Sequence, residues 1–298
     1  MTKSLVTGGA GFIGSNLVDS LIKLGHEVIV IDNESAESNE EFYWNEKAQN
    51  YKYDIRDYKN TRPLYDGVDY VFHLAAESRI QPAILNPIEA VSINCVGTVT
   101  VLQCAREAEV KKVVYSSTSS GYGFNEPPNI ETQSDDCLNP YSVSKVSGEK
   151  LCKMYTNLFG LKTISFRYFN VYGERQPVRG QYAPVIGIFL RQRNNKESLT
   201  IVGDGEQRRD FTHVSDVVQA NILAATVDVE DEFYGQLYNV GNSENYSINE
   251  IANAISDNQV NIPPRIGEAR TTLANSEKLR TIFGWQPQVN LIDWITKQ

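Results

Sequence analysis

The feature that most constrains this sequence is the glycine-rich stretch Thr7-Gly8-Gly9-Ala10-Gly11-Phe12-Ile13-Gly14 near its amino terminus. The stretch follows a short apolar run, Leu5-Val6, which is typical of a strand. After it, apolar residues recur at helical spacing and predict one buried helix face, at Ile13, Leu17, Leu21 and Leu24. A strand, a glycine turn and a helix in this order are the setting in which a glycine fingerprint indicates a dinucleotide site.

Three of the glycines have separate tasks in such a turn. Gly8 permits the tight turn, Gly11 lets the backbone approach a pyrophosphate, and Gly14 lets the helix pack closely on the strand. The free amides and the positive dipole end of the helix then face the phosphates. A glycine triplet alone leaves an ordinary strand–helix turn open as the alternative, so a second signal is needed.

The second signal is an acid at the end of the next predicted strand. The apolar run Val28-Ile29-Val30-Ile31 is typical of a buried strand, and Asp32 follows it directly. An acidic residue about 20 residues beyond the fingerprint suits a ribose hydroxyl. It would repel a 2′-phosphate, so we expect the cofactor to be NAD rather than NADP.

Composition limits the partners of the chain. The 298 residues, 41% of them hydrophobic, suffice for one large domain or two of ordinary size. The formal net charge is -9 without a basic run, so we expect neither nucleic acid nor an anionic membrane as a partner. Without a signal peptide or a run approaching membrane-span length, a cytoplasmic protein is expected. The cysteines lack CxxC spacing, so we expect reduced, mostly buried thiols and no metal site at Cys95, Cys104, Cys137 and Cys152.

Strand and helix patterns alternate through the first 170 residues and predict a parallel sheet with crossover helices. Beyond Asn170 the pattern loosens, so we place a domain boundary there. Residues 1–170 are expected to form a Rossmann-type, doubly wound α/β domain, and residues 171–298 a smaller mixed α/β domain that partly returns to the first sheet. The other expected strands are Tyr51–Ile55, Tyr70–Ala76, Lys112–Ser116, Thr163–Tyr168 and Leu199–Val202, and the expected helices are Pro87–Ala108, Tyr141–Phe159 and Pro184–Asn194.

Tyr141 and Lys145 are four residues apart on a predicted helix, so they share a face. An ammonium nearby, together with a positive nicotinamide ring, favours the phenolate of a tyrosine. A phenolate can take the proton of a carbinol while the ring takes its hydride, and the Thr118 hydroxyl is placed to hold the same oxygen. Tyr-x-x-x-Lys alone is common on surface helices. The upstream NAD fingerprint and the Ser/Thr run between them favour catalysis.

Three further polar residues lie at informative positions. Asp54 ends the third predicted strand, where it would either accept from the adenine amine or cap the following turn. His73, in the strand that ends in the small residues Ala75 and Ala76, is expected to be structural. Asn94 is polar amid apolar neighbours on its predicted helix, so it should have a hydrogen-bond partner.

These motifs resemble those of the extended short-chain dehydrogenase/reductase family. The stretches Thr7–Gly14, His73–Ala76, Ser116–Gly123 and Tyr141-x-x-x-Lys145 occur in the family's order. Other stretches resemble its NAD-dependent UDP-sugar 4-epimerases, which act on UDP-glucose and UDP-N-acetylglucosamine. They are Arg167–Gly173, Gly203–Phe211 and Arg265–Glu268, and the similarity covers nearly the whole chain.

The resemblance implies 4-epimerisation of a UDP-hexose or UDP-N-acetylhexosamine through a transient 4-keto sugar, in a homodimer. Tyr141 would take the proton of the sugar 4-hydroxyl, with Lys145 and Thr118 as its partners. The implied cofactor-binding residues are Gly8, Gly11, Phe12, Ile13, Gly14, Asp32, Asn33, Asp54, Ile55, Leu74, Ala75, Ala76, Asn94, Tyr141, Lys145 and Tyr168. The implied substrate-binding residues are Ser78, Arg79, Thr118, Asn170, Val185, Val202, Arg209, Arg265 and Glu268.

Departures from the family pattern leave alternatives open. Dehydratases carry Thr-Asp-Glu where this chain has Thr118-Ser119-Ser120, which argues against dehydration. Gly121 replaces a usual valine and is expected to loosen the loop below the sugar. Arg79 replaces a small residue; it is either a surface arginine or faces a carboxylate, which would favour a uronate 4-epimerase. Thr272, near a position that is bulky in strict hexose epimerases, favours tolerance of N-acetyl groups. A uronate decarboxylase and a non-catalytic NAD-binding module are the remaining alternatives.

Overall fold

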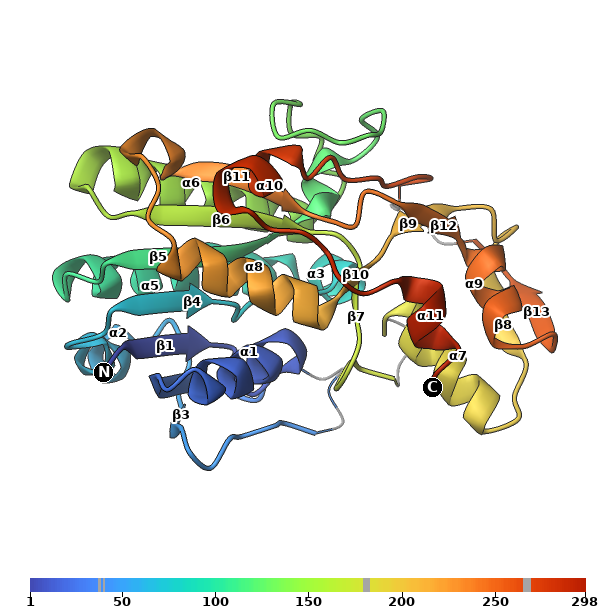
Figure 1. The fold of residues 1–298 in the computed structure, drawn as a ribbon, viewed down its shortest axis with the longest axis horizontal. Coiled ribbons are helices and arrows are strands. Elements are labelled where there is room, and N and C mark those ends of the chain that lie inside the picture. Colours follow the sequence, from blue (N-terminus) through green and yellow to red (C-terminus); the bar gives the residue numbers. More distant parts are fainter. Residues whose placement is uncertain (37–38, 40, 179–182, 265–268) are drawn as a thin grey trace.

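A computed structural model describes residues 1–36, 39, 41–178, 183–264 and 269–298. Within these residues the central element is a seven-stranded sheet in the order β11-β6-β5-β4-β1-β2-β3 (Figure 1). Every neighbouring pair in it is parallel. The order reverses between β1 and β4, as in doubly wound sheets, which places a crevice at the carboxyl ends of these strands. The strands are β1 Lys3–Thr7, β2 Glu27–Asp32, β3 Gln49–Lys52, β4 Tyr70–His73, β5 Lys112–Thr118, β6 Thr163–Tyr168 and β11 Gln236–Val240.

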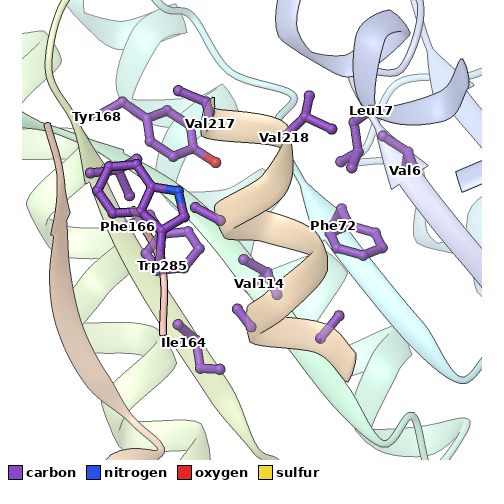
Figure 2. Close-up of a cluster of buried hydrophobic side chains, with 14 of the residues drawn as sticks. Val6, Leu17, Phe72, Val114, Ile164, Phe166, Tyr168, Val217, Val218 and Trp285 are labelled. Carbon is purple, nitrogen blue, oxygen red and sulfur yellow. The ribbon is translucent and has the colours of Figure 1, made fainter. Parts of the chain in front are cut away.

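Helices cover both faces of this sheet, as the crossover connections require. One cluster of buried side chains joins α1 and α8 to the sheet, and Figure 2 shows Val217 of α8 beside Tyr168 of β6 and Val218 of α8 beside Leu17 of α1. A second cluster joins α5 and α6 to the opposite face. The helical segments are α1 Phe12–Lys23, α2 Tyr58–Thr61, η1 Arg62–Tyr65, α3 Ile80–Leu85, α4 Pro87–Val91, η2 Ser92–Gly97, α5 Thr98–Glu107, η3 Ser119–Tyr122, α6 Pro140–Phe159, α8 Val214–Thr226 and α10 Glu277–Phe283.

A smaller group of elements lies beyond the carboxyl ends of the sheet strands (Figure 1). It has its own core, in which Ile186, Phe189 and Ile251 are buried. As expected, part of the second half returns to the sheet, because β11 pairs with β6. The division at residue 170 stays a prediction. The elements of this group are β7 Val171–Tyr172, α7 Val185–Asn194, β8 Leu199–Val202, β9 Arg208–Asp210, β10 Thr212–His213, β12 Asn245–Ser247, α9 Ile248–Ile255, β13 Gln259–Ile262 and α11 Leu291–Ile295. The short η4 Asp231–Phe233 lies instead at the amino-terminal end of β6, where Asp231 pairs with Lys162.

Two local predictions were wrong. The strand expected at 51–55 is β3 Gln49–Lys52 instead. The chain turns soon after Lys52, and the Asp54 side chain stabilises this turn because its Oδ1 accepts from the backbone N of Arg56 at 2.8 Å. Leu24, expected on the buried face of α1, is 59% exposed. It is the C-cap residue of the helix, and Gly25 after it has a φ of 83°, so the chain turns away from the core before Leu24 can face it.

The helix expected at 87–108 is present, but its middle is a π-helical segment that the apolar pattern of the sequence did not predict. Regular turns in α4 and α5 flank a π-helical segment, η2, which contains Asn94. The whole stretch Pro87–Glu107 is long and apolar enough to cross a membrane, contrary to the expectation that no run approaches that length. However, 50% of that apolar window is buried inside the fold, which is also found in a core helix.

The thiols and Gly121 differ in part from their predictions. All four cysteines are free; Cys104 and Cys152 are buried, while Cys95 and Cys137 are partly exposed. Gly121 does not loosen its loop, because it is buried and a Cβ there would lie 2.8 Å from Cγ2 of Val146 and 3.0 Å from Cζ of Arg167. The missing side chain makes room for this arginine.

Candidate active site

A cavity of about 520 Å³ opens at the carboxyl ends of the sheet strands and extends to the smaller group of elements. It lies at the reversal between β1 and β4, where doubly wound sheets bind ligands. Of the site residues that the sequence predicts, all those that the structure describes line the wall of this cavity, except Asn94. Arg265 and Glu268 lie outside the described residues.

The glycine turn forms one end of the cavity. A Cβ on Gly8, whose φ is 70°, would lie 2.7 Å from the backbone N of Ala75, and one on Gly14 would lie 2.1 Å from the carbonyl oxygen of Gly8. Side chains are therefore excluded at both positions by the chain itself. At Gly11 the nearest atom to such a Cβ is 3.4 Å away, so the fold tolerates one there. The space above Gly11 fits a group brought by a ligand, such as the pyrophosphate of NAD.

Asp32 stands beside this turn at the end of β2 and also lines the cavity. Its carboxylate accepts from the backbone N of Ala10 at 3.1 Å and of Glu34 at 2.8 Å, so it braces the turn. Burial raises the pKa of this carboxyl group. An acid in this position, next to the glycine cradle, fits the ribose hydroxyls of NAD.

Asp54 lines the cavity wall and holds an arginine. The Arg56 guanidinium donates to Asp54 from Nε at 3.0 Å and from Nη2 at 2.6 Å, and this pairing lowers the pKa of the Asp54 carboxyl. Asp54 also caps the turn that follows it, as one alternative expected, because its Oδ1 accepts from the backbone N of Arg56, whereas Asp57 is the N-cap of helix α2. The contact with adenine stays a prediction.

Tyr141 and Thr118 meet in the middle of the cavity. The Asn139 cap and Pro140 start α6, so its first turn carries Tyr141 to the end of β5, where Thr118 is the last strand residue. β5 is two residues longer than predicted, ending at Thr118 rather than Ser116. The Thr118 hydroxyl hydrogen-bonds the Tyr141 phenol. The two residues that the sequence proposed as catalytic partners are therefore in direct contact.

The electrostatics of Tyr141 differ from the expectation. Burial raises the pKa of the phenol, and the Thr118 hydrogen bond and the positive charge of Arg79 act in the opposite direction. Lys145, expected to be the cation beside the phenol, is 3% exposed, and its Nζ lies 4.5 Å from the centroid of the Tyr115 ring. Burial lowers the pKa of Lys145 to about 8. The positive charge that acts on Tyr141 here is that of Arg79, and the negative charge of Glu77 opposes it.

Asn94 lies behind the cavity rather than in its wall. Its Oδ1 accepts from the backbone N of Glu77 at 2.9 Å, and its Nδ2 donates to the Glu77 carbonyl at 3.0 Å and to Ser144 Oγ at 2.9 Å. The expected hydrogen-bond partner is confirmed, but these contacts are with protein groups. His73 is likewise structural: its ring contacts the hydroxyls of Thr7 and Thr98, and burial lowers its pKa to about 3.

The residues predicted to bind substrate occupy the other end of the cavity. Arg79 lies in the wall, so the alternative of an outer-surface arginine is wrong. Asn170 Nδ2 donates to the carbonyl oxygen of Asp210 at 2.7 Å and to Thr272 Oγ1 at 3.4 Å, which places Thr272 behind Asn170. Arg209 Nη1 donates to the carbonyl oxygen of Arg208 at 3.0 Å. Ser78, Val185 and Val202 also line this end.

Several wall residues were missed by the sequence analysis. Thr200 was recoverable, because it is two residues from Val202 on β8 and alternate residues of a strand share a face. Tyr115 is not part of the wall but lies beneath Lys145, and it carries no local signal, since this contact depends on how α6 packs on β5. Other cavity residues not predicted include Ser35, Tyr53, Gln81, Ile186, Phe189, Gln207 and Phe211.

Comparison with known proteins agrees with this geometry. The sequence profile described as "NAD dependent epimerase/dehydratase family" matches residues 4–241. A putative UDP-glucose 4-epimerase of Methanocaldococcus jannaschii is 35% identical, over 98% of this chain and 96% of that protein.

Two solved structures cover 99% of this chain and 96% of their own chains, each with a TM-score of 0.92. One is a UDP-glucose 4-epimerase of Thermotoga maritima with UDP-glucose, 33% identical. The other is a UDP-N-acetylglucosamine 4-epimerase of Methanobrevibacter ruminantium M1 with UDP-N-acetylmuramic acid, 32% identical. With the glycine cradle, the acid at Asp32 and the Thr118–Tyr141 pair in one cavity, the chain belongs to the NAD-dependent epimerase/dehydratase family, among its UDP-sugar 4-epimerases.

Proposed function

We propose that this protein interconverts the C4 epimers of a UDP-hexose or a UDP-N-acetylhexosamine through a transient 4-keto sugar. The observation that carries the proposal is the single cavity onto which both the glycine turn and the Thr118–Tyr141 pair open. When bound, NAD accepts a hydride from the sugar and returns it. The relatives named above, a UDP-glucose and a UDP-N-acetylglucosamine 4-epimerase, support both sugar classes.

Tyr141 is the base of the proposed reaction. Its phenolate takes the proton of the sugar 4-hydroxyl as the C4 hydride leaves, and the phenol returns the proton after the 4-keto sugar has rotated. The Thr118 hydroxyl donates its one hydrogen to the Tyr141 oxygen and can accept from the sugar 4-hydroxyl, which orients the carbinol. The buried Lys145 ammonium lies on the same helix face and holds positive charge near the bound cofactor. In the proposed reaction the carbinol at C4 thus loses a proton and a hydride, and the 4-keto sugar later regains both.

The UDP group is proposed to lie along the far end of the cavity. The Arg209 guanidinium is a planar fork suited to a pyrophosphate, and Asn170 lies near it. Val202 and Thr200 of β8 would line the uracil pocket. Arg265, also proposed for the phosphates, and Glu268, proposed for the ribose hydroxyls, follow from the family motif.

Turnover of two substrates tests this function. The protein is incubated separately with UDP-glucose and with UDP-N-acetylglucosamine, and proton NMR follows the 4-epimers. We expect a 4-epimer from at least one of them. Tyr141→Phe should bind UDP with unchanged affinity yet lose activity by a factor on the order of 100 to 10,000, because the base is gone. Undiminished activity of this variant would exclude the phenolate mechanism. NAD binding by the wild type without any epimer formed would favour the non-catalytic module.

Acceptance of the N-acetyl group is a finer part of the proposal. Thr272 lies behind Asn170 at the substrate end, where its Oγ1 accepts from Asn170 Nδ2 at 3.4 Å, and a larger side chain there would press on Asn170. We expect Thr272→Tyr to lower activity on UDP-N-acetylglucosamine relative to UDP-glucose. An unchanged ratio of the two activities would refute this role.

A uronate 4-epimerase or decarboxylase is the second candidate, and Arg79 in the cavity wall favours it. The relative from Methanobrevibacter ruminantium M1 holds UDP-N-acetylmuramic acid, a UDP-sugar that carries a carboxylate. The acid pair of a dehydratase is absent at this strand end, where the residues are Ser119 and Ser120.

We also propose that the protein is a homodimer. Helices α3, α4 and α6 lie against one another and expose apolar side chains. A cluster of this kind on a folded chain is typical of an interface between subunits. The cluster, here called the α4–α6 face, comprises Ile84, Leu85, Ile88, Val91, Val143, Met154 and Leu158.

A further inference from the structure

Lys145 is enclosed between α6, on which it lies, and the strand β5. Gly148 permits this close packing, because a Cβ there would lie 2.2 Å from the hydroxyl oxygen of Tyr115 on β5. The Tyr115 hydroxyl donates to the Lys145 carbonyl oxygen at 3.1 Å, and its ring lies beneath the Lys145 Nζ. An ammonium in such a place is removed from the water that would stabilise its charge, so its protonation depends on the groups that face it.

Most of the groups that face Lys145 are neutral near pH 8. Apart from one carboxylate, the titratable groups around it are Tyr141 and Cys152 of α6, Cys95 of η2, Tyr115 of β5 and His73 of β4. Burial raises the pKa of each of these phenols and thiols, so they keep their protons. Burial lowers the pKa of the imidazole to about 3, so it is uncharged as well. Among the residues that the structure describes, the negative charge that acts on Lys145 is therefore that of Glu149.

Glu149 lies one helical turn beyond Lys145 on α6. Tyr141, Lys145 and Glu149 are thus spaced four residues apart along a single face of the helix. Side chains on a helix lean toward its amino terminus, which brings the Glu149 carboxylate back toward Lys145. The Glu149 side chain is 10% exposed and does not line the cavity. Its charge is therefore little screened by solvent.

Two strands fix the Glu149 carboxylate in place. Arg167 of β6 donates to it twice, from Nε to Oε1 and from Nη2 to Oε2, both at 2.8 Å. Ser117 of β5, the residue before Thr118, also donates to Oε1 from its hydroxyl. The missing side chain of Gly121 makes the room that this arginine occupies. A two-point pairing with a guanidinium sets the position of a carboxylate firmly.

We propose that Glu149 is a positioning residue of the active site, whose negative charge, fixed by Arg167, keeps Lys145 an ammonium. This inference rests on the proposed function, in which Lys145 holds positive charge near the bound cofactor. It adds to that function the group that sustains the charge. Glu149 acts through Lys145 and touches neither the sugar nor the cofactor.

The test follows the protonation of Lys145 by NMR of protein that carries ¹³C at the lysine Cε. The signal of Lys145 is the one that is lost in Lys145→Arg. We expect its titration midpoint at about 8 in the wild type. Glu149→Gln should lower the midpoint by about one pH unit, as expected when an opposite charge nearby is removed. The alkaline limit of kcat/KM should fall by the same amount.

Asp135→Asn is the matched control. Asp135 also pairs with Arg167, at 2.6 Å, but it does not act on Lys145, so the midpoint should stay unchanged. Glu149→Gln removes one partner of a buried guanidinium, which costs stability. If it does not fold, the double variant Glu149→Gln, Arg167→Gln removes both charges together. The same fall is expected in it, because Arg167 does not act on Lys145. Thermal melting confirms that each variant is folded.

Three outcomes would overturn the proposal. The first is a Lys145 midpoint that stays in place when Glu149 is replaced. The second is an equal fall in Asp135→Asn, which would assign the effect to the pairing of Arg167. The third is a lower midpoint without a lower alkaline limit, which would show that Glu149 does not act on the reaction. A wild type that turns over no UDP-sugar ends the proposed function instead, because the NMR titration does not depend on turnover and still supports or refutes the action of Glu149 on Lys145.

Discussion

At the scale of single residues, the proposed site depends on how a phenol and an ammonium behave when buried. Burial raises the pKa of Tyr141 and lowers that of Lys145, so both groups are driven toward their neutral forms. The Thr118 hydrogen bond and the Arg79 charge oppose this at the phenol. At Lys145, the face of the Tyr115 ring, 4.5 Å from Nζ, attracts the charged form.

The lowered pKa of Lys145 predicts an alkaline limit to activity. If the reaction needs the ammonium, kcat/KM falls as the pH rises through about 8, because Lys145 then loses its proton. Lys145→Arg keeps a charged group and should move this fall to higher pH, at a lower maximal rate. A pH–rate profile of both proteins measures it. Identical alkaline limits for the two would show that Lys145 does not set the limit.

At single residues, the sequence predicts those features of the site that depend on the spacing of residues close together in the chain. The glycine turn, Asp32 and the pair Tyr141 and Lys145 are separated by fixed numbers of residues within one turn or helix, and all of them line the cavity. Contacts between distant segments were not predictable in this way. The Tyr115 ring beneath Lys145 depends on the packing of α6 against β5, and spacing alone gives no sign of it.

At the scale of elements, the loop after β4, the helical run α4-η2-α5 and α6 meet at Asn94. The π-helical turn of η2 brings its side chain between Glu77 and Ser144, where it makes the three hydrogen bonds described above. Changes of winding of this type occur often at functional sites. The helical pattern predicts the run of 87–108 but not this turn, because a π-helical segment of six residues is too short to show a period of its own.

Removing the Asn94 side chain should loosen this junction. Asn94→Ala leaves the buried polar groups of Glu77 without their partner, which costs on the order of 1–3 kcal/mol in the free energy of unfolding. Urea denaturation measures the loss. Activity should fall as well, because the loop that carries Arg79 is no longer tied to α6. Asn60→Ala, at an exposed helix start, serves as the control and should change stability less. Equal losses in the two variants would contradict the role of Asn94.

At the scale of the whole molecule, two groups of elements enclose the site between them. The sheet and its helices supply the glycine turn and the pair Thr118 and Tyr141, while the smaller group supplies Val202 and Arg209. The sequence predicts the sheet well, because its strands are buried apolar runs bounded by turns, such as β6 Thr163–Tyr168. The smaller group is less predictable, since its strands are short and pair at long range, as β9 does with β12.

The α4–α6 face predicts the oligomeric state. Light scattering should give the wild type about twice the 33.5 kDa of one chain. The double variant Ile88→Glu, Leu158→Glu places two charges on this face and should give the mass of one chain. Leu24→Glu is the matched control, because Leu24 is an exposed leucine outside the face. A wild type with the mass of one chain, or a double variant that stays dimeric, would contradict the proposed interface.

The most direct test of the epimerase account follows the hydrogen on C4 of the sugar. UDP-glucose and UDP-N-acetylglucosamine carrying deuterium at C4 are each converted in ordinary water, and the products are analysed by NMR and mass spectrometry. Because a hydride leaves C4 and returns to the same carbon from the opposite side, the 4-epimer should keep its deuterium at C4. A 4-epimer with ordinary hydrogen at C4, acquired from water, would contradict the transfer of a hydride within this cavity.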